Sequence, residues 1–208
     1  NLRLGIPSGS RIEFLPTRTE KPIVVYGTSI AQGACASRPG MAWTNILGRK
    51  LDYPIVNLGF SGNGRLETEV LELVTEIDAQ VYVLDCLPNL SPNEKHTEEE
   101  IKKRLRNSIR HLRNNRPKAR ILLAQHAGYS DGEVDSSRKK IYETLNRWIG
   151  EVFLEFKPII NERLFLLPKS KINLSNEAFV DGTHPTDLGM EQYANAYQVV
   201  ISPLLPKE

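Results

Sequence analysis

The sequence predicts an α/β fold, a three-layer α/β/α sandwich built on a five-stranded parallel sheet. From residue 22 onward, short runs rich in β-branched residues alternate with longer stretches of helical periodicity, as consecutive βαβ units do. Several of the short runs are apolar almost throughout, as strands must be when helices cover both faces of their sheet. The 208 residues are the right size for one ordinary domain.

Five strands and five helices are expected. The strands are Ile23–Gly27, Ile55–Gly59, Gln80–Asp85, Arg120–His126 and Arg163–Pro168. The helices are Ala42–Leu51, Leu66–Ile77, Thr97–Asn115, Ser136–Phe156 and Asp187–Ser202. Right-handed crossovers between such strands predict the flavodoxin-like order 2-1-3-4-5, in which an active site lies beyond the carboxyl ends of the strands.

The segment Asn1–Lys21 fits no βαβ unit, so we divide the chain into an N-terminal linker or edge segment, 1–21, and an α/β domain, 22–208. Within the first segment, Arg11–Leu15 could be an edge strand or the tail of an upstream domain. The third helix carries a capping-box pattern, Thr97 with Glu100. Trp148 lies on the apolar stripe of the fourth helix and is expected in the core.

Composition excludes several classes of partner. With 27 Lys plus Arg against 25 Asp plus Glu, the net charge of +2 is too small to indicate nucleic acid. The basic stretch Lys102–Arg120 is interpreted as a solvated helix face. No apolar run reaches the length of about 18 residues that a membrane span needs, and the first residues lack the pattern of a secretory signal. The oligomeric state and the compartment are left open.

The two cysteines, Cys35 and Cys86, are too few and too far apart in sequence for a disulfide framework or a CxxC metal site. They are expected to be buried free thiols.

Polar residues follow the first strand in Gly27-Thr28-Ser29-Ile30-Ala31-Gln32-Gly33. Glycines on both sides of a serine permit a tight turn that presents the serine, with its own N–H, to a ligand. The run is not a P-loop, because no GK[ST] follows, and it is not a GxSxG nucleophile elbow. Ser29 is therefore a candidate nucleophile.

The second and third strands also end in polar loops. Gly62 lies in the glycine-rich loop after the second strand, and Asn89 follows the third strand in Asp85-Cys86-Leu87-Pro88-Asn89. Backbone N–H groups and an uncharged amide are the donors of an oxyanion hole, so Ser29, Gly62 and Asn89 are its candidates. Taken singly, either loop also fits ordinary turn chemistry.

Near the C-terminus, Asp181 precedes His184 by three residues in a glycine-containing turn that ends at Pro185. This spacing can place a carboxylate against imidazole Nδ1 and leave Nε2 free to accept a serine proton. One His and one Asp are too few ligands for a metal site, and no metal or other cofactor is expected. His96 and His111 are expected to be solvated, whereas His126 borders the pocket or has a structural role.

Together these motifs resemble the SGNH superfamily of GDSL-type lipases and acylhydrolases, in order and over roughly residues 22–200. The resemblance implies that Ser29 in Gly27-Thr28-Ser29 is the nucleophile, with Thr28 where the family usually has Asp. It also implies that Gly62 and Asn89 are oxyanion donors and that Asp181 and His184 complete a triad. The familiar GxND of the family is replaced here by Asp-Cys-Leu-Pro-Asn.

The function expected from the resemblance is that of a serine esterase that cleaves a small ester of a small molecule or carbohydrate. An acetyl ester is the favoured substrate. The motifs look like those of a bacterial branch in which a small β-rich domain often precedes the hydrolase and members are commonly exported. A lysophospholipase or thioesterase for longer chains is one alternative. A non-catalytic carbohydrate-binding module on the same fold is another.

Overall fold

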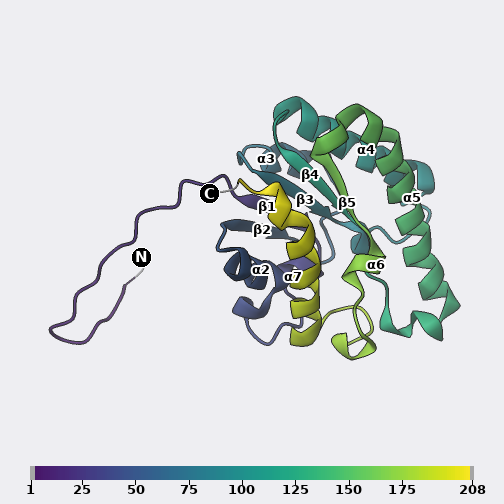
Figure 1. Cartoon of the computed structure of the whole chain (residues 1–208). Helices are drawn as coiled ribbons and strands as arrows, with labels where there is room; N and C mark the ends of the chain where they lie inside the picture. Colours follow the sequence, from purple (N-terminus) through teal and green to yellow (C-terminus); the bar gives the residue numbers. More distant parts are fainter. Residues whose placement is uncertain (1–2, 207–208) are drawn as a thin grey trace.

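A five-stranded parallel sheet forms the centre of the computed structural model, which describes residues 3–206 (Figure 1). The strands are β1 (Ile23–Gly27), β2 (Ile55–Gly59), β3 (Val81–Asp85), β4 (Arg120–Ala124) and β5 (Leu164–Leu167). They lie in the order β2-β1-β3-β4-β5, and every neighbouring pair is parallel. The predicted fold class and strand order are confirmed.

Helices cover both faces of this sheet. The seven α-helices among the described residues are α1 (Ser29–Gln32), α2 (Trp43–Leu51), α3 (Thr68–Val74), α4 (Glu98–Asn115), α5 (Ser136–Ile160), α6 (Lys169–Ile172) and α7 (Asp187–Ile201). One hydrophobic core packs α3, α4 and α5 against the sheet, and a second packs α1, α2, α6 and α7 against its other face. Trp148 lies in the first core, as expected.

Short 3₁₀ turns supplement the helices, among them one at Leu87–Asn89 and one at Ser130–Glu133. All strand ends agree with the predicted bounds to within two residues. Helix α3 begins two residues late because Leu66 has a positive φ of 59°, outside the helical region. Helix α5 ends at Ile160, four residues past its predicted end at Phe156. The extension contains Pro158.

The segment before β1 forms no helix or strand over its described residues. Arg11–Leu15 is not an edge strand, because no neighbouring strand reaches it and Phe14 and Leu15 are 85% and 90% exposed. Figure 1 shows this segment extending away from the sheet. Asn1, Leu2, Lys207 and Glu208, at the ends of the two predicted segments, lie outside the described residues. The assignment of 1–21 as a linker stays a prediction.

The basic stretch on α4 lies on an exposed helix face that pairs with acidic side chains. Lys102 contacts Glu98 and Glu151, and Arg106 contacts Glu155 across to α5. At the start of α4, the Thr97 side chain accepts a hydrogen bond from the Glu100 amide, as the capping pattern predicted. Within residues 3–206, no helix is long and apolar enough to cross a membrane.

Candidate active site

The carboxyl ends of β1, β2 and β3 meet at one edge of the sheet, since β1 lies between the other two strands. Gly27 at the end of β1 is in register with Gly59 of β2 and with Asp85 of β3. Immediately after β1, the buried Thr28 caps α1 by accepting a hydrogen bond from the Ile30 amide. Thr and Asp are both good caps, which explains why Thr28 is tolerated in this place.

Ser29, the first residue of α1, meets His184 across the site. Its Oγ lies 2.9 Å from His184 Nε2, and His184 Nδ1 lies 2.7 Å from Asp181 Oδ2. The three predicted side chains therefore form one continuous hydrogen-bonded chain, although Ser29 and His184 are 155 positions apart. Ser29 is 8% exposed, so neighbouring residues cover most of its surface.

The Asp181 carboxylate is held ionised by its own turn. Desolvation opposes ionisation, but hydrogen bonds from the His184 amide, the His184 ring and the Thr183 amide outweigh it and lower the pKa of Asp181 to about 2. The carboxylate therefore remains charged throughout the neutral range. A charged Asp181 fixes the proton on Nδ1 and leaves Nε2 with its lone pair toward Ser29.

Residues of the β4–α5 connection and of the first turn of α5 support the turn that carries Asp181 and His184. Arg138 donates to Thr183 Oγ1 at 2.9 Å and is itself held by Asp131 at 2.7 Å. The Ser130 amide donates to the carbonyl of Gly182 at 3.1 Å. None of these residues was a predicted site residue, because their link to the turn depends on side chains distant in sequence.

The loop after β2 lies close over α1. A Cβ on Gly59 would come within 2.2 Å of the Gln32 nitrogen, so only glycine permits this approach. Gly62 has a positive φ of 68°, and its N–H makes no hydrogen bond among the described residues. The predicted oxyanion donor at Gly62 is thus a free N–H group in the loop beside Ser29.

Asn89 reaches the same loop from β3. Its side-chain amide donates to the Phe60 carbonyl at 3.3 Å and to the Asn63 carbonyl. These bonds bracket Gly62, so Asn89 positions the glycine loop and also uses its amide hydrogens there. An oxyanion would have to take one of those hydrogens from a carbonyl.

Two further polar links hold the site together and were missed from the sequence. Asn57 in β2 donates to the Ala31 carbonyl at 2.7 Å and to Thr44 Oγ1 at 2.8 Å, which joins α1, α2 and β2. Ser37, in the loop after α1, donates from its amide to Asp187 Oδ1 at 2.8 Å. The signal for Asn57 was present, since an asparagine is out of place in an apolar strand, but Ser37 has no local signal.

His126 is buried and structural. Its Nδ1 accepts from the Gly128 amide at 2.9 Å, and Asn146 bonds both its amide and its carbonyl. Burial lowers the pKa of His126 to about 3, so the ring is neutral. Of the two interpretations of His126, the structural one is therefore favoured.

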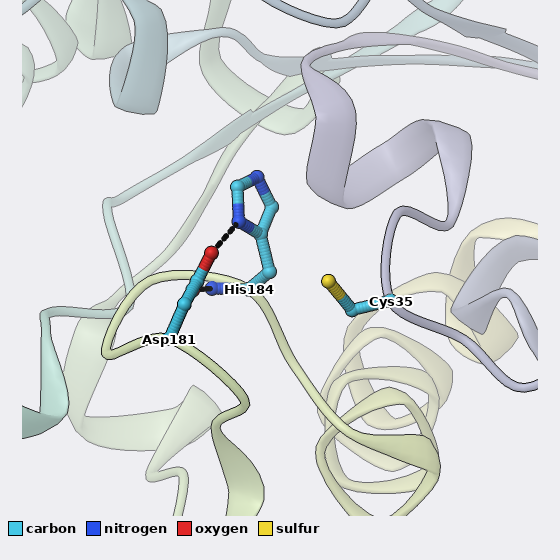
Figure 2. Close-up of side chains that lie close together, drawn as sticks. All are labelled: Cys35, Asp181 and His184. Carbon is cyan, nitrogen blue, oxygen red and sulfur yellow. Dashed lines mark hydrogen bonds and ion pairs between the residues drawn. The ribbon is translucent and has the colours of Figure 1, made fainter.

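Cys35 corrects an expectation. Cys86 is buried as predicted, but Cys35 is exposed. The prediction for Cys35 was wrong: this residue lies in the loop after α1 with a positive φ of 67°, and its thiol lies near Asp181 and His184 and not in the core. Figure 2 shows the Cys35 thiol pointing toward Asp181 and His184.

Asp85 is a buried carboxyl at the end of β3, on the sheet face covered by α7. It is 4% exposed, and its Oδ2 has no hydrogen-bond partner among the described residues. Burial raises the pKa of Asp85 to about 6, against which the neighbouring Tyr197 hydroxyl acts. The unfolded chain ionises this group near pH 3.9, so the folded state binds the extra proton and loses stability as pH rises from about 4 to about 6.

We therefore expect Asp85→Asn to stabilise the protein at pH 8 but not at pH 4. The substitution removes a buried charge whose raised pKa corresponds to about 3 kcal/mol at the constant of 1.36 kcal/mol per pKa unit. Urea denaturation of both proteins at the two pH values measures the difference. Equal pH dependence in wild type and variant would contradict the role of Asp85.

An open hollow lies along the loop that follows α1. It has a volume of about 520 Å³ and is lined by the loop after α1 and by Ser61, including Gln32, Ser37 and Arg38. Hollows of similar size lie beside Arg18 and beside Glu143, and none of these three hollows is lined by a candidate site residue.

Residues 20–202 match the GDSL-like Lipase/Acylhydrolase family. Comparison with curated proteins found no match. Among solved structures, a protein assigned as a GDSL-like lipase from Bacteroides ovatus is 35% identical, with a TM-score of 0.80 over 89% of this chain and 53% of that one. The chain thus spans about half the length of that relative.

Two more distant structures share the fold alone. A family two carbohydrate esterase from Clostridium thermocellum, solved with cellohexaose, is 14% identical with a TM-score of 0.72, over 93% of this chain and 67% of that one. A carbohydrate acetylesterase from Sinorhizobium meliloti is 14% identical with a TM-score of 0.67, over 89% of this chain and all of that one. The family match and the relative from Bacteroides ovatus cover most of the chain, which therefore belongs to the GDSL-like lipase/acylhydrolase family of hydrolases.

Proposed function

We propose that the protein is a serine esterase that cleaves short acyl esters, acetyl above all, from a carbohydrate or a similarly polar alcohol. The observation that carries this proposal is the hydrogen-bonded chain from Ser29 Oγ through His184 to Asp181. A serine activated by a histidine that a carboxylate orients is the arrangement that acyl transfer needs.

In the proposed cycle, His184 Nε2 takes the Ser29 proton as Oγ attacks the ester carbonyl. Asp181 stabilises the imidazolium that forms, and the imidazolium gives its proton to the departing alcohol. The acyl group is then bound to Ser29 as an ester. Water, deprotonated by His184, attacks this acyl-enzyme and releases the acid, which restores the hydroxyl of Ser29.

The oxyanion is stabilised by N–H groups on two sides. The Ser29 amide is at the start of α1, and the Gly62 amide, which makes no hydrogen bond among the described residues, lies in the loop that packs against α1. The Asn89 amide is the proposed third donor, and it must exchange one of its bonds to the glycine loop for a bond to the oxyanion. A donor that switches partners binds the transition state more strongly than the ground state, as catalysis requires.

We expect Asn89→Ala to lower kcat by about a hundredfold with little change in KM, because one oxyanion donor is worth about that much. Steady-state kinetics on p-nitrophenyl acetate measures both constants. Asn93→Ala is a suitable control, since Asn93 lies four residues on and bonds only within its own turn. A change confined to KM would instead make Asn89 a binding residue.

Two observations support a short acyl group on a polar alcohol. The hollow along the loop after α1, which Ser61 of the glycine loop also borders, is lined in part by the polar side chains of Gln32, Ser37 and Arg38. Beside the glycine loop, Phe60 is 40% exposed but packs its ring against Tyr26, while Leu87 and Leu90 are buried. The site therefore offers a long acyl chain little apolar surface, and each methylene left in water forgoes about 0.8 kcal/mol.

The test is a comparison of p-nitrophenyl acetate with p-nitrophenyl octanoate, followed by acetylated sugars. We expect kcat/KM to be at least about tenfold higher for acetate, because the apolar side chains near the glycine loop are buried or packed against one another and offer a longer chain little contact. Acetate released from an acetylated sugar would identify the alcohol side. A preference for octanoate would indicate a lysophospholipase or thioesterase. If the protein hydrolysed none of these esters, a non-catalytic carbohydrate-binding module would be the remaining alternative.

A further inference from the structure

We propose that Cys35, Asp181 and His184 form a zinc site, and that a zinc ion bound there inhibits the esterase. The two residues of the catalytic turn supply only two ligands. The exposed thiol of Cys35, which comes from the loop after α1, supplies the third (Figure 2).

The three side chains are near enough to share one ion. One ligand atom from each, a sulfur, a ring nitrogen and a carboxylate oxygen, lie within 4.8 Å of one another. Zinc bonds of about 2.3 Å to sulfur and about 2.0 Å to nitrogen or oxygen place ligand atoms about 3.5 Å apart. To reach that spacing, Asp181 Oδ2 and His184 Nδ1, now 2.7 Å apart, would have to separate and the Cys35 sulfur would have to approach them. The ion enters from solvent because Cys35 and Asp181 are both exposed.

The loop that carries Cys35 is tied to the helix that follows His184. Ser37 donates from its amide to Asp187 Oδ1 at 2.8 Å and from its hydroxyl to Asp187 Oδ2 at 2.5 Å. Asp187 is the first residue of α7, three residues after His184. These bonds hold the thiol beside the catalytic turn, so zinc binding does not have to order a loose loop.

The donor set selects zinc over the common hard cations. Thiolate and imidazole suit zinc, whereas magnesium and calcium require a shell of oxygen ligands. Three protein ligands leave the fourth position of a tetrahedral zinc to water. Binding displaces the thiol proton, and also the Nδ1 proton where that nitrogen is the ligand, so zinc affinity rises with pH.

A bound zinc removes the groups that the esterase cycle uses. His184 coordinated to the ion can no longer pass a proton from Ser29 to the leaving alcohol, and Asp181 no longer orients the ring. This inhibitory consequence rests on the proposed function. The binding of zinc itself does not, since it requires only the three ligands.

The experiment titrates the untagged chain with zinc chloride by calorimetry and repeats the titration with Cys35→Ser and Cys86→Ala. Cys35→Ser removes the proposed ligand, and Cys86→Ala removes the buried thiol as a matched control. We expect one zinc per chain for wild type and Cys86→Ala, and binding at least about tenfold weaker for Cys35→Ser. With cobalt(II) as the probe, thiolate-to-metal absorption in the near ultraviolet should appear in wild type and be lost in Cys35→Ser.

Hydrolysis of p-nitrophenyl acetate gives the second measurement. Zinc should inhibit wild type and Cys86→Ala, a chelator should restore the rate, and magnesium at the same concentration should have no effect. Cys35→Ser should keep its basal rate and need at least about tenfold more zinc for half-inhibition.

Zinc binding or inhibition unchanged by Cys35→Ser would overturn the site, as would an active esterase that binds no zinc. If instead the chain binds zinc through Cys35 but hydrolyses no ester, the zinc site stands and the esterase proposal is the one that fails.

Discussion

Ser29→Ala should reduce the hydrolysis of p-nitrophenyl acetate to the uncatalysed background, a loss on the order of 10⁵-fold or more. The substitution removes the atom that attacks the carbonyl, and no other hydroxyl is hydrogen-bonded to His184 Nε2 among the described residues. The fold should be unaffected, because the only side-chain hydrogen bond that Ser29 makes is the one to His184. Circular dichroism and a thermal melt check this second expectation.

Ser61→Ala is the matched control for that experiment. Ser61 lies in the facing loop, and its recorded bond to Gln32 uses the backbone amide, which alanine retains. It should keep wild-type kcat within about twofold, because the substitution removes only a hydroxyl and leaves the backbone bond of the loop in place. If Ser29→Ala still hydrolysed the ester at the wild-type rate, Ser29 would not be the nucleophile.

The second large effect is expected for Asp181→Asn, which should lower kcat by about three to four orders of magnitude with KM nearly unchanged. An asparagine can still accept from the Thr183 and His184 amides through its oxygen, so the turn keeps its shape. Its NH₂ group, however, now faces His184 Nδ1 and moves the ring proton to Nε2. The imidazole then cannot accept the proton of Ser29.

Steady-state kinetics at several pH values measures this loss, with Asp78→Asn as a control for the same chemical change. Asp78 is half exposed and pairs with Lys21 on the surface. The pKa of Asp181 is about 2, so the wild-type rate should show no loss from protonation of this carboxyl above about pH 4. A drop of less than tenfold in Asp181→Asn would reduce Asp181 to a structural residue of the turn.

The fold was largely readable from the sequence because a parallel sheet with both faces covered needs apolar strands. β1, β3 and β4 are such runs, and their predicted ends are at most two residues from the observed ones. The site residues were readable for a related reason, since strand ends in one sheet must converge. Ser29 and Gly62 follow β1 and β2 as predicted, and the turn that carries Asp181 and His184 meets Ser29 at the same edge of the sheet.

What the sequence did not reveal depends on contacts between distant segments. Cys35 lies between two alanines, a setting typical of burial, yet its backbone conformation turns the thiol toward a turn some 150 positions away. In the sequence, Arg138 is an ordinary arginine of a predicted helix. Its role depends on the hydrogen bond that it donates to Thr183, 45 positions further along the chain. Arg11–Leu15 has the composition of a strand but no neighbour to pair with, and composition cannot supply one.

The 155 positions between Ser29 and His184 also have a consequence for folding. Ser29 follows the first strand, whereas His184 comes after the last, so no partly folded chain that lacks the final turn can join them. Closing so long a loop is slow relative to local helix formation, because chain entropy is lost before the contact is made. Recovery of the proposed esterase activity during refolding should therefore follow the docking of this turn, whereas far-ultraviolet circular dichroism reports helices that form earlier.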